Sequence, residues 1–155
     1  MTHKISLEDF DTNERYDVIT LFGVLEHVNN PTKLLFKAKE LLNDNGLIVF
    51  EVPSADCVLM RYLRKSLFSP YRYIEHTRHL SFFSRQSLYY MCDQLELEII
   101  DVKSVGFDLQ TILLDGRKEL PILQEILNEM NLADHYRVFV RRKYADRNNT
   151  SKSKL

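Results

Sequence analysis

The chain has 155 residues, enough for one domain with a sizeable hydrophobic core and too few for two. An ordinary apolar share and a net charge of -1 argue against a general nucleic-acid-binding or membrane-surface protein. No signal peptide follows Met1 and no apolar run approaches the roughly 20 residues of a membrane span, so we predict a cytoplasmic protein with neither a nucleic-acid nor a membrane partner.

The first predicted elements are two strands. Residues 16–22 and 47–53 are short apolar runs that are rich in β-branched side chains and bounded by turn residues, as in strands buried on both faces. Residues 3–7 are compatible with the end of an earlier strand, and a polar loop separates them from the first of these runs.

A helix is predicted between the two strands, over residues 31–43. Its leucines and Ala38 recur at helical spacing, while charged residues occupy the opposite face. Asn30 suits the N-cap, Pro31 the first helical position and Asn45-Gly46 the stop. A strand–helix–strand unit of this kind predicts parallel strands joined by a right-handed crossover.

The later part of the chain predicts three more helices and two more strands. The helices are expected to begin at Ser54, Ser84 and Pro121, each followed by apolar residues at helical spacing. Residues 97–105 predict a strand, and the alternation of apolar and basic residues over 135–144 predicts a last strand at or near a sheet edge.

Strands and helices alternate along residues 1–144, which predicts one α/β domain with a largely parallel sheet and helices on both faces. Residues 145–155 are polar and basic without periodicity, so we predict a disordered tail there. Cys57 and Cys92 lie in apolar helical patterns and not at a metal or redox spacing, which predicts buried free thiols in a reducing compartment.

Four signatures, in this order, resemble the central part of class I S-adenosylmethionine-dependent methyltransferases. They are Tyr-Asp-Val-Ile at 16–19, Leu-Glu-His-Val-x-x-Pro at 25–31, Leu-Leu-x-x-x-Gly at 41–46 and a strand ending in Val-Pro at 52–53. In addition, His-x-x-x-Phe-Ser at 79–84 resembles a segment of one branch of that superfamily. The resemblance covers residues 5–102 and implies a partial Rossmann-like sheet with a terminal antiparallel strand, whose hairpin connection carries an extra helix within 107–134.

The cofactor-binding half of that fold is not recognisable in this sequence. The superfamily holds S-adenosylmethionine with a glycine-rich loop after its first strand, where a Cβ would block the ligand. The only glycines here are isolated: Gly23, Gly46, Gly106 and Gly116. The resemblance therefore implies that the chain begins at the third strand and lacks roughly 60–90 residues. We expect S-adenosylmethionine to bind a complete form and to bind this chain weakly or not at all. We also expect an exposed edge that favours self-association or an amino-terminal-half partner.

The resemblance also implies two groups of site residues. The cofactor side of the pocket is expected to be lined by Phe22, Gly23 and Val24. Glu26, His27 and His79 are expected to face the methyl acceptor, where a histidine can act as a general base. In the alternative interpretation, Glu26 and His27 only fix the start of the next helix, and His79 is a hydrogen-bonded structural residue.

A metal site is not predicted. Some relatives that methylate catechol-like quinone precursors hold a divalent ion with Glu-x-x-Glu-His, but here Gly23 stands at the position of the first glutamate. A zinc site formed by His27, His76 and His79 is the alternative, although their spacing is not that of a known zinc motif.

The leading hypothesis is a truncated or partial S-adenosylmethionine-dependent methyltransferase that transfers a methyl group to an unidentified small-molecule or glycan acceptor. Because the glycine loop is missing, enzymatic activity of the chain itself stays open. The alternative is a non-catalytic, methyltransferase-like binding or dimerisation module. A small metal-dependent hydrolase that uses the three histidines is a remote third.

Overall fold

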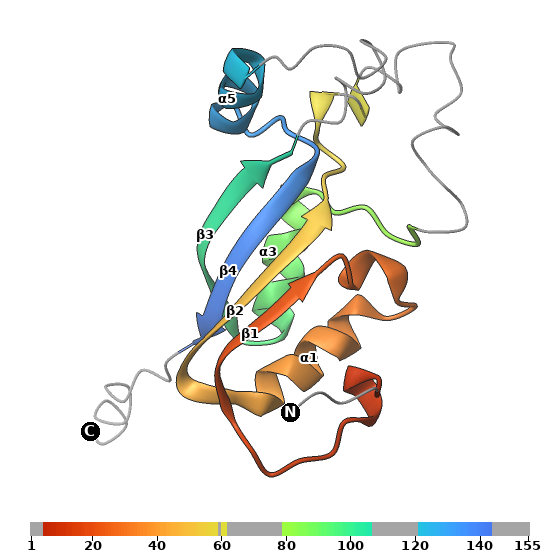
Figure 1. Ribbon diagram of the computed structural model, residues 1–155, viewed down its shortest axis with the longest axis vertical. Helices are drawn as coiled ribbons and strands as arrows, with labels where there is room; N and C mark the ends of the chain where they lie inside the picture. Colours follow the sequence, from red (N-terminus) through yellow and green to blue (C-terminus); the bar gives the residue numbers. More distant parts are fainter. Residues whose placement is uncertain (1–4, 59, 62–78, 107–120, 144–155) are drawn as a thin grey trace, which may run out of the picture.

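A four-stranded mixed sheet forms the centre of the computed structural model, which describes residues 5–58, 60–61, 79–106 and 121–143 (Figure 1). Its strands lie in the order β1-β2-β4-β3, with bounds β1 (Tyr16–Phe22), β2 (Leu42–Pro53), β3 (Leu97–Val105) and β4 (His135–Arg142). β1 and β2 run parallel, and β4 runs antiparallel to both β2 and β3. The predicted partial Rossmann-like sheet with a terminal antiparallel strand is confirmed.

The last strand lies near an edge of the sheet and not at it. β4 is flanked by β2 and by the edge strand β3. The two sides of β4 differ in polarity. Tyr136, Val138 and Val140 are buried on the helical side of the sheet, while Arg137 and Arg141 on the other side form ion pairs with neighbouring strands.

The described helices are α1 (Pro31–Leu41), α3 (Arg85–Gln94) and α5 (Pro121–Glu129), and the last of these is the extra helix expected in the hairpin connection. The predicted caps are confirmed, because Asn30 accepts a hydrogen bond from the Lys33 amide and Ser84 accepts one from the Ser87 amide. Of the helix expected after Ser54, residues 58, 60 and 61 are helical, and the rest lies outside the described residues. None of the described helices is long and apolar enough to cross a membrane.

Two predictions about local structure are wrong. The chain forms a 3-10 turn, η1 (Leu7–Asp9), where the end of a strand was expected, because the Ser6 hydroxyl accepts the Glu8 amide and favours a turn. β2 also begins at Leu42, directly after α1, and not at residue 47. An irregularity in its pairing with β1 accommodates residues 43–46.

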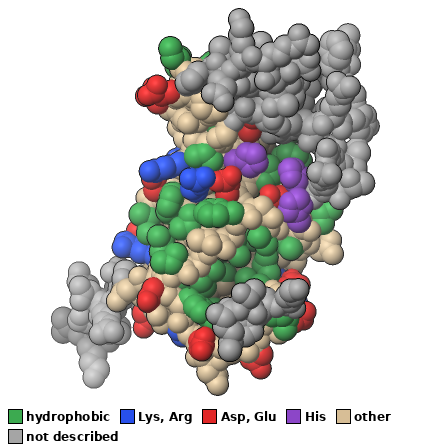
Figure 2. Space-filling model, viewed as in Figure 1, with side chains coloured by type: hydrophobic (Ala, Val, Ile, Leu, Met, Phe, Trp, Pro, Cys, Tyr) green, Lys and Arg blue, Asp and Glu red, His purple; other side chains and the backbone are tan. Residues whose placement is uncertain are grey.

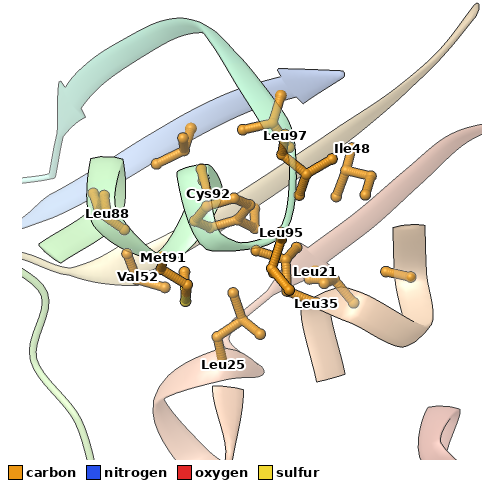
Figure 3. Packing of buried hydrophobic residues seen from close by; sticks show 14 of the residues in the cluster. Leu21, Leu25, Leu35, Ile48, Val52, Leu88, Met91, Cys92, Leu95 and Leu97 are labelled. Carbon is orange, nitrogen blue, oxygen red and sulfur yellow. The ribbon is translucent and has the colours of Figure 1, made fainter. Parts of the chain in front are cut away.

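α1 and α3 pack on the same face of the sheet and share one core with it (Figure 3). The core members that Figure 3 labels are Leu21, Leu25, Leu35, Ile48, Val52, Leu88, Met91, Cys92, Leu95 and Leu97. Both cysteines are buried and free, as predicted. Folding removes from water the apolar faces of α1 and α3 together with the inward side of the strands. This burial is the main contribution to the stability of the fold.

The opposite face of the sheet carries no helix among the described residues, although helices were expected on both faces. Val18 is 58% and Phe22 54% exposed there. Figure 2 shows hydrophobic side chains gathered over the strands on this face, beside lysine and arginine side chains. Within the described part of the chain, β1 also pairs on one side only, with β2, so its other edge keeps its backbone groups available.

Candidate active site

The candidate site begins where β1 ends. The chain leaves the strand through Gly23, whose φ of +65° lies in the left-handed region that side chains disfavour. It then closes a 3-10 turn, η2 (Leu25–His27), in which the His27 amide donates to the Val24 carbonyl. Leu25 is fully buried in the core and fixes this turn, so that Glu26 is held at 4% exposure while the His27 side chain stays 41% exposed.

A segment from far along the chain lies beside this turn. The Leu80 amide donates to the Glu26 carbonyl over 2.7 Å, and Phe83 exchanges backbone hydrogen bonds with Pro53 and Ala55 at the end of β2. Residues 79–83 are therefore held beside η2 and the end of β2. Because β1 and β2 are parallel, their carboxyl ends meet at one edge of the sheet, which is where ligands bind in open α/β folds.

This arrangement brings Glu26, His27 and His79 together. Each offers one ligand-type atom, and these atoms lie within 4.8 Å of one another. Oε1 of Glu26 lies 3.7 Å from Nε2 of His27, and the two imidazole centroids are 5.0 Å apart. The His79 ring also meets the edge of Phe82, with centroids 5.8 Å apart. Figure 2 shows histidine side chains at the surface on this side of the molecule.

Glu26 is in an unusual environment for a carboxylate. Its Oε2 is buried, and no hydrogen-bond partner for it exists among the described residues. A buried polar atom without a hydrogen bond is costly, so this oxygen is a candidate acceptor for a proton donor on a bound ligand. His76, the third histidine of the alternative zinc site, lies outside the described residues.

The residues expected on the cofactor side also lie at this end of β1. Phe22 is half exposed, and the Arg137 guanidinium lies 5.6 Å from its ring centroid. Arg137 is held in turn by Glu51, at 2.7 Å. A Cβ at Gly23 would come no closer than 3.9 Å to Oε1 of Glu26, so the turn requires glycine for its backbone conformation and not for space. Val24 is half buried and packs against the core.

One carboxylate near the site, that of Asp56, was not predicted from the sequence. Oδ2 of Asp56 accepts hydrogen bonds from the Arg85 amide at 2.8 Å and from the Tyr136 hydroxyl at 3.1 Å. It joins the turn after β2 to the start of α3 and to β4. Burial raises the pKa of Tyr136, and the negative charge of Asp56 raises it further against the lowering effect of a Ser54 hydrogen bond. No sequence motif marks Asp56, because its partners come from distant segments.

Comparison with known sequences relates the chain to methyl-transferring enzymes. The sequence model of a family described as methyltransferase domain matches residues 2–102. The mitochondrial ubiquinone biosynthesis O-methyltransferase of Candida albicans is 34% identical over 53 residues, which are 34% of this chain and 16% of that protein.

Solved structures show the same fold. A S-adenosylmethionine-dependent methyltransferase of Thermotoga maritima, described as a possible histamine N-methyltransferase, superposes with a TM-score of 0.58 at 14% identity, over 89% of this chain and 61% of that one. A S-adenosylmethionine-dependent methyltransferase of Clostridium acetobutylicum gives 0.55 at 10% identity, over 90% and 63%. Magnesium protoporphyrin IX methyltransferase of Synechocystis, solved with bound S-adenosylhomocysteine, gives 0.54 at 9% identity, over 90% and 49%. The chain thus spans less than two thirds of each of these relatives.

Proposed function

This chain belongs to the methyltransferase domain family of S-adenosylmethionine-dependent enzymes, and from that membership we propose that it forms the acceptor-binding part of a methyltransferase for a small-molecule or glycan acceptor. The observation that carries the proposal is the meeting of Glu26, His27 and His79 at the carboxyl ends of the parallel strands β1 and β2. Ligands of open α/β sheets bind at this edge.

In this proposal the three side chains activate the acceptor. The exposed face of His27 or His79 takes the proton from the acceptor's hydroxyl or amine, since imidazole changes its charge near neutral pH. Glu26, with Oε1 3.7 Å from Nε2 of His27, orients that ring and stabilises the positive charge that the proton brings. Phe82 supports the His79 ring from its edge.

In this proposal the chain supplies only one wall of the methyl-donor site. S-adenosylmethionine supplies the methyl group when it is bound, and the half-exposed Phe22, the Gly23 turn and Val24 would form one wall for it. The sequence offers no glycine-rich loop for the opposite side. We therefore expect the chain by itself to bind the donor weakly, and we propose that the open edge of β1 takes up an amino-terminal-half partner or a second copy of the chain.

Nuclear magnetic resonance tests the donor wall even when binding is weak. Millimolar S-adenosylhomocysteine is expected to shift the amide signals of Phe22, Gly23 and Val24 and to leave the exposed Tyr90 on α3 unchanged. Shifts elsewhere, or none at 22–24, would refute the assignment of this wall. Calorimetry showing micromolar affinity for a monomer would contradict the one-sided site, and light scattering that reports a stable monomer would count against a strand-pairing edge.

Methyl transfer tests the acceptor side. With a catechol such as 3,4-dihydroxybenzoate as the acceptor, and with the amino-terminal half supplied if it is needed, His79→Ala is expected to lower turnover about 10²–10⁴-fold. Its effect on donor affinity should be small, because His79 lies on the acceptor side in this proposal. Unchanged turnover in a folded His79→Ala variant would remove this residue from the mechanism. If the wild-type chain binds the amino-terminal half but the complex transfers no methyl group, the non-catalytic module is favoured.

A further inference from the structure

The two outer strands of the sheet differ in how well they can pair with another strand. Along β3, the pairing with β4 is irregular between Ile99 and Asp101, and the exposed side chains of Asp101 and Lys103 form an ion pair beside this irregularity. α5 also lies beside the carboxyl end of β3, where Val105 and Asn128 line one pocket (Figure 1). Irregular pairing, charged side chains and a covering helix all protect a sheet edge. The β3 edge is therefore unsuited to strand addition.

The outer edge of β1 lacks this protection. Its pairing with β2 is regular from Val18 to Phe22, and the one charged residue of the strand, Asp17, precedes this stretch. No other strand pairs with this edge among the described residues. Val18 is 58% and Phe22 54% exposed, and Thr20 between them is exposed as well. An unprotected edge with apolar side chains is a template for another strand.

The regular stretch of β1 is complementary to itself. When two copies meet antiparallel about a twofold axis at Thr20, each Val18 lies opposite Phe22 of the second copy, and the two threonines lie opposite each other. On the helical face of the sheet, Ile19 then lies opposite Leu21. Pairs of an aromatic with a β-branched residue and pairs of threonines are among the favourable cross-strand pairs. Every side chain of this stretch therefore meets a suitable neighbour.

We propose that the chain forms a twofold dimer in which β1 pairs antiparallel with β1 of a second copy, centred on Thr20. The pair joins two four-stranded sheets into one and lets Val18 and Phe22 of each copy cover those of the other. The two Asp17 carboxylates lie about 20 Å apart in this register, beyond the screening length at physiological salt. A strongly acidic or basic partner would find no opposite charge between Val18 and Phe22.

Naming this partner rests on the proposed function, which leaves the β1 edge open to a second copy. The pairing places Asp17 of the second copy beside Gly23, so both copies border the proposed donor wall. The dimer itself is measured without donor, acceptor or methyl transfer. Its failure and a failure of the acceptor site are therefore separate results.

Disulfide trapping tests the register of the pair. The Cα atoms of directly opposite residues lie about 4.5–5.5 Å apart, which a disulfide can span, whereas the two Val18 lie about 13 Å apart. The two native cysteines are buried and do not compete. Under mild oxidation, the full chain with Thr20→Cys should form a cross-linked dimer at least about tenfold faster than the matched control Val18→Cys. Ile100→Cys, at an exposed position of β3, should be as slow as Val18→Cys.

Sedimentation tests the dimer without cross-linking. The wild-type chain should show a monomer–dimer equilibrium with a micromolar Kd, since a strand pair over Val18–Phe22 is smaller than a standard interface. Thr20→Lys and Thr20→Glu should each weaken dimerisation at least about tenfold, because like charges then face each other at the axis. An equimolar mixture of these two variants should restore it. Ile100→Lys should keep the wild-type Kd, and circular dichroism confirms that each variant is folded.

Three results would overturn the proposal. The first is a wild-type chain that stays monomeric at about 300 μM; the amino-terminal half is then the occupant of the β1 edge, and methyl transfer by that complex would support the proposed function without this dimer. The second is cross-linking of Val18→Cys or Ile100→Cys as fast as that of Thr20→Cys. The third is a mixture of Thr20→Lys and Thr20→Glu that associates no better than either variant alone.

Discussion

Replacing Gly46 with alanine is expected to destabilise the junction between α1 and β2. A Cβ at this position would lie 2.7 Å from both Cγ and Cδ1 of Leu42 and 3.0 Å from the carbonyl oxygen of Asn43. Real Cβ atoms do not approach other atoms so closely. Leu42 is 1% exposed and packed in the core, so its side chain has no free space to move into, and the Asn43 oxygen belongs to the backbone.

The size of the effect follows from two opposing terms. Forcing an extra methyl group into a packed region costs about 1–3 kcal/mol. Alanine also restricts the unfolded chain more than glycine, which favours folding by about 0.4–1 kcal/mol. We therefore expect Gly46→Ala to lower the free energy of unfolding by up to about 2.6 kcal/mol, with a central value of about 1.3 kcal/mol. This loss is measured as a lower midpoint of urea unfolding with an unchanged slope.

A double-mutant cycle identifies the clash as the cause. Leu42→Ala alone should cost about 2–5 kcal/mol, because it opens a cavity. It also removes the two atoms that meet the new methyl group, so the double variant should be more stable than the sum of the single losses by about 1 kcal/mol or more. Gly23→Ala, where the Cβ has room but φ is +65°, is the control and should show no such coupling to Leu42. Wild-type or higher stability of Gly46→Ala, or strict additivity with Leu42→Ala, would refute the reasoning.

Further predictions concern Cys92, Ser84 and Tyr136. Burial raises the pKa of Cys92 to about 12, so the thiol should resist a disulfide reagent at pH 8 until urea unfolds the chain, and rapid labelling of the native protein would contradict its burial. Because the folded pKa lies above the unfolded value of 9.0, the contribution of Cys92 to stability is complete below pH 9 and is lost as pH rises toward 12, which urea midpoints across that range would reveal. Ser84→Ala removes the cap of α3 and should cost about 1 kcal/mol, whereas Ser84→Asn should retain most of it. Tyr136→Phe leaves the ring in the core but removes a hydrogen bond to the Asp56 carboxylate, so thermal unfolding should show a loss of about 1.5–3 kcal/mol; an unchanged melting temperature would mean that this bond is not formed.

The sequence by itself determined the local elements. The apolar spacing predicted α1, α3, α5 and the four strands, and Asn30 and Ser84 are the caps that it indicated. Such features depend on residues within one or two turns of each other, whose side chains line one face at a period near 2 or 3.6. The boundaries of the elements were less certain. Asn45-Gly46 predicted the end of a helix, but Gly46 lies inside the irregularly paired strand β2, where a Cβ would clash with Leu42.

The tertiary structure alone decided which elements meet. Arg137 and Arg141 indicated a strand at or near an edge for β4. Their ion-pair partners on β2 and β3 show that it lies one strand in from the edge. The likeness to methyltransferases assigned Glu26, His27 and His79 to the acceptor side. Only the pairing of residues 79–83 with η2 and β2 brings polar atoms of the three side chains within 4.8 Å of one another. Local periodicity carries no information on contacts between distant segments, because these depend on how the helices and strands bury their apolar faces together.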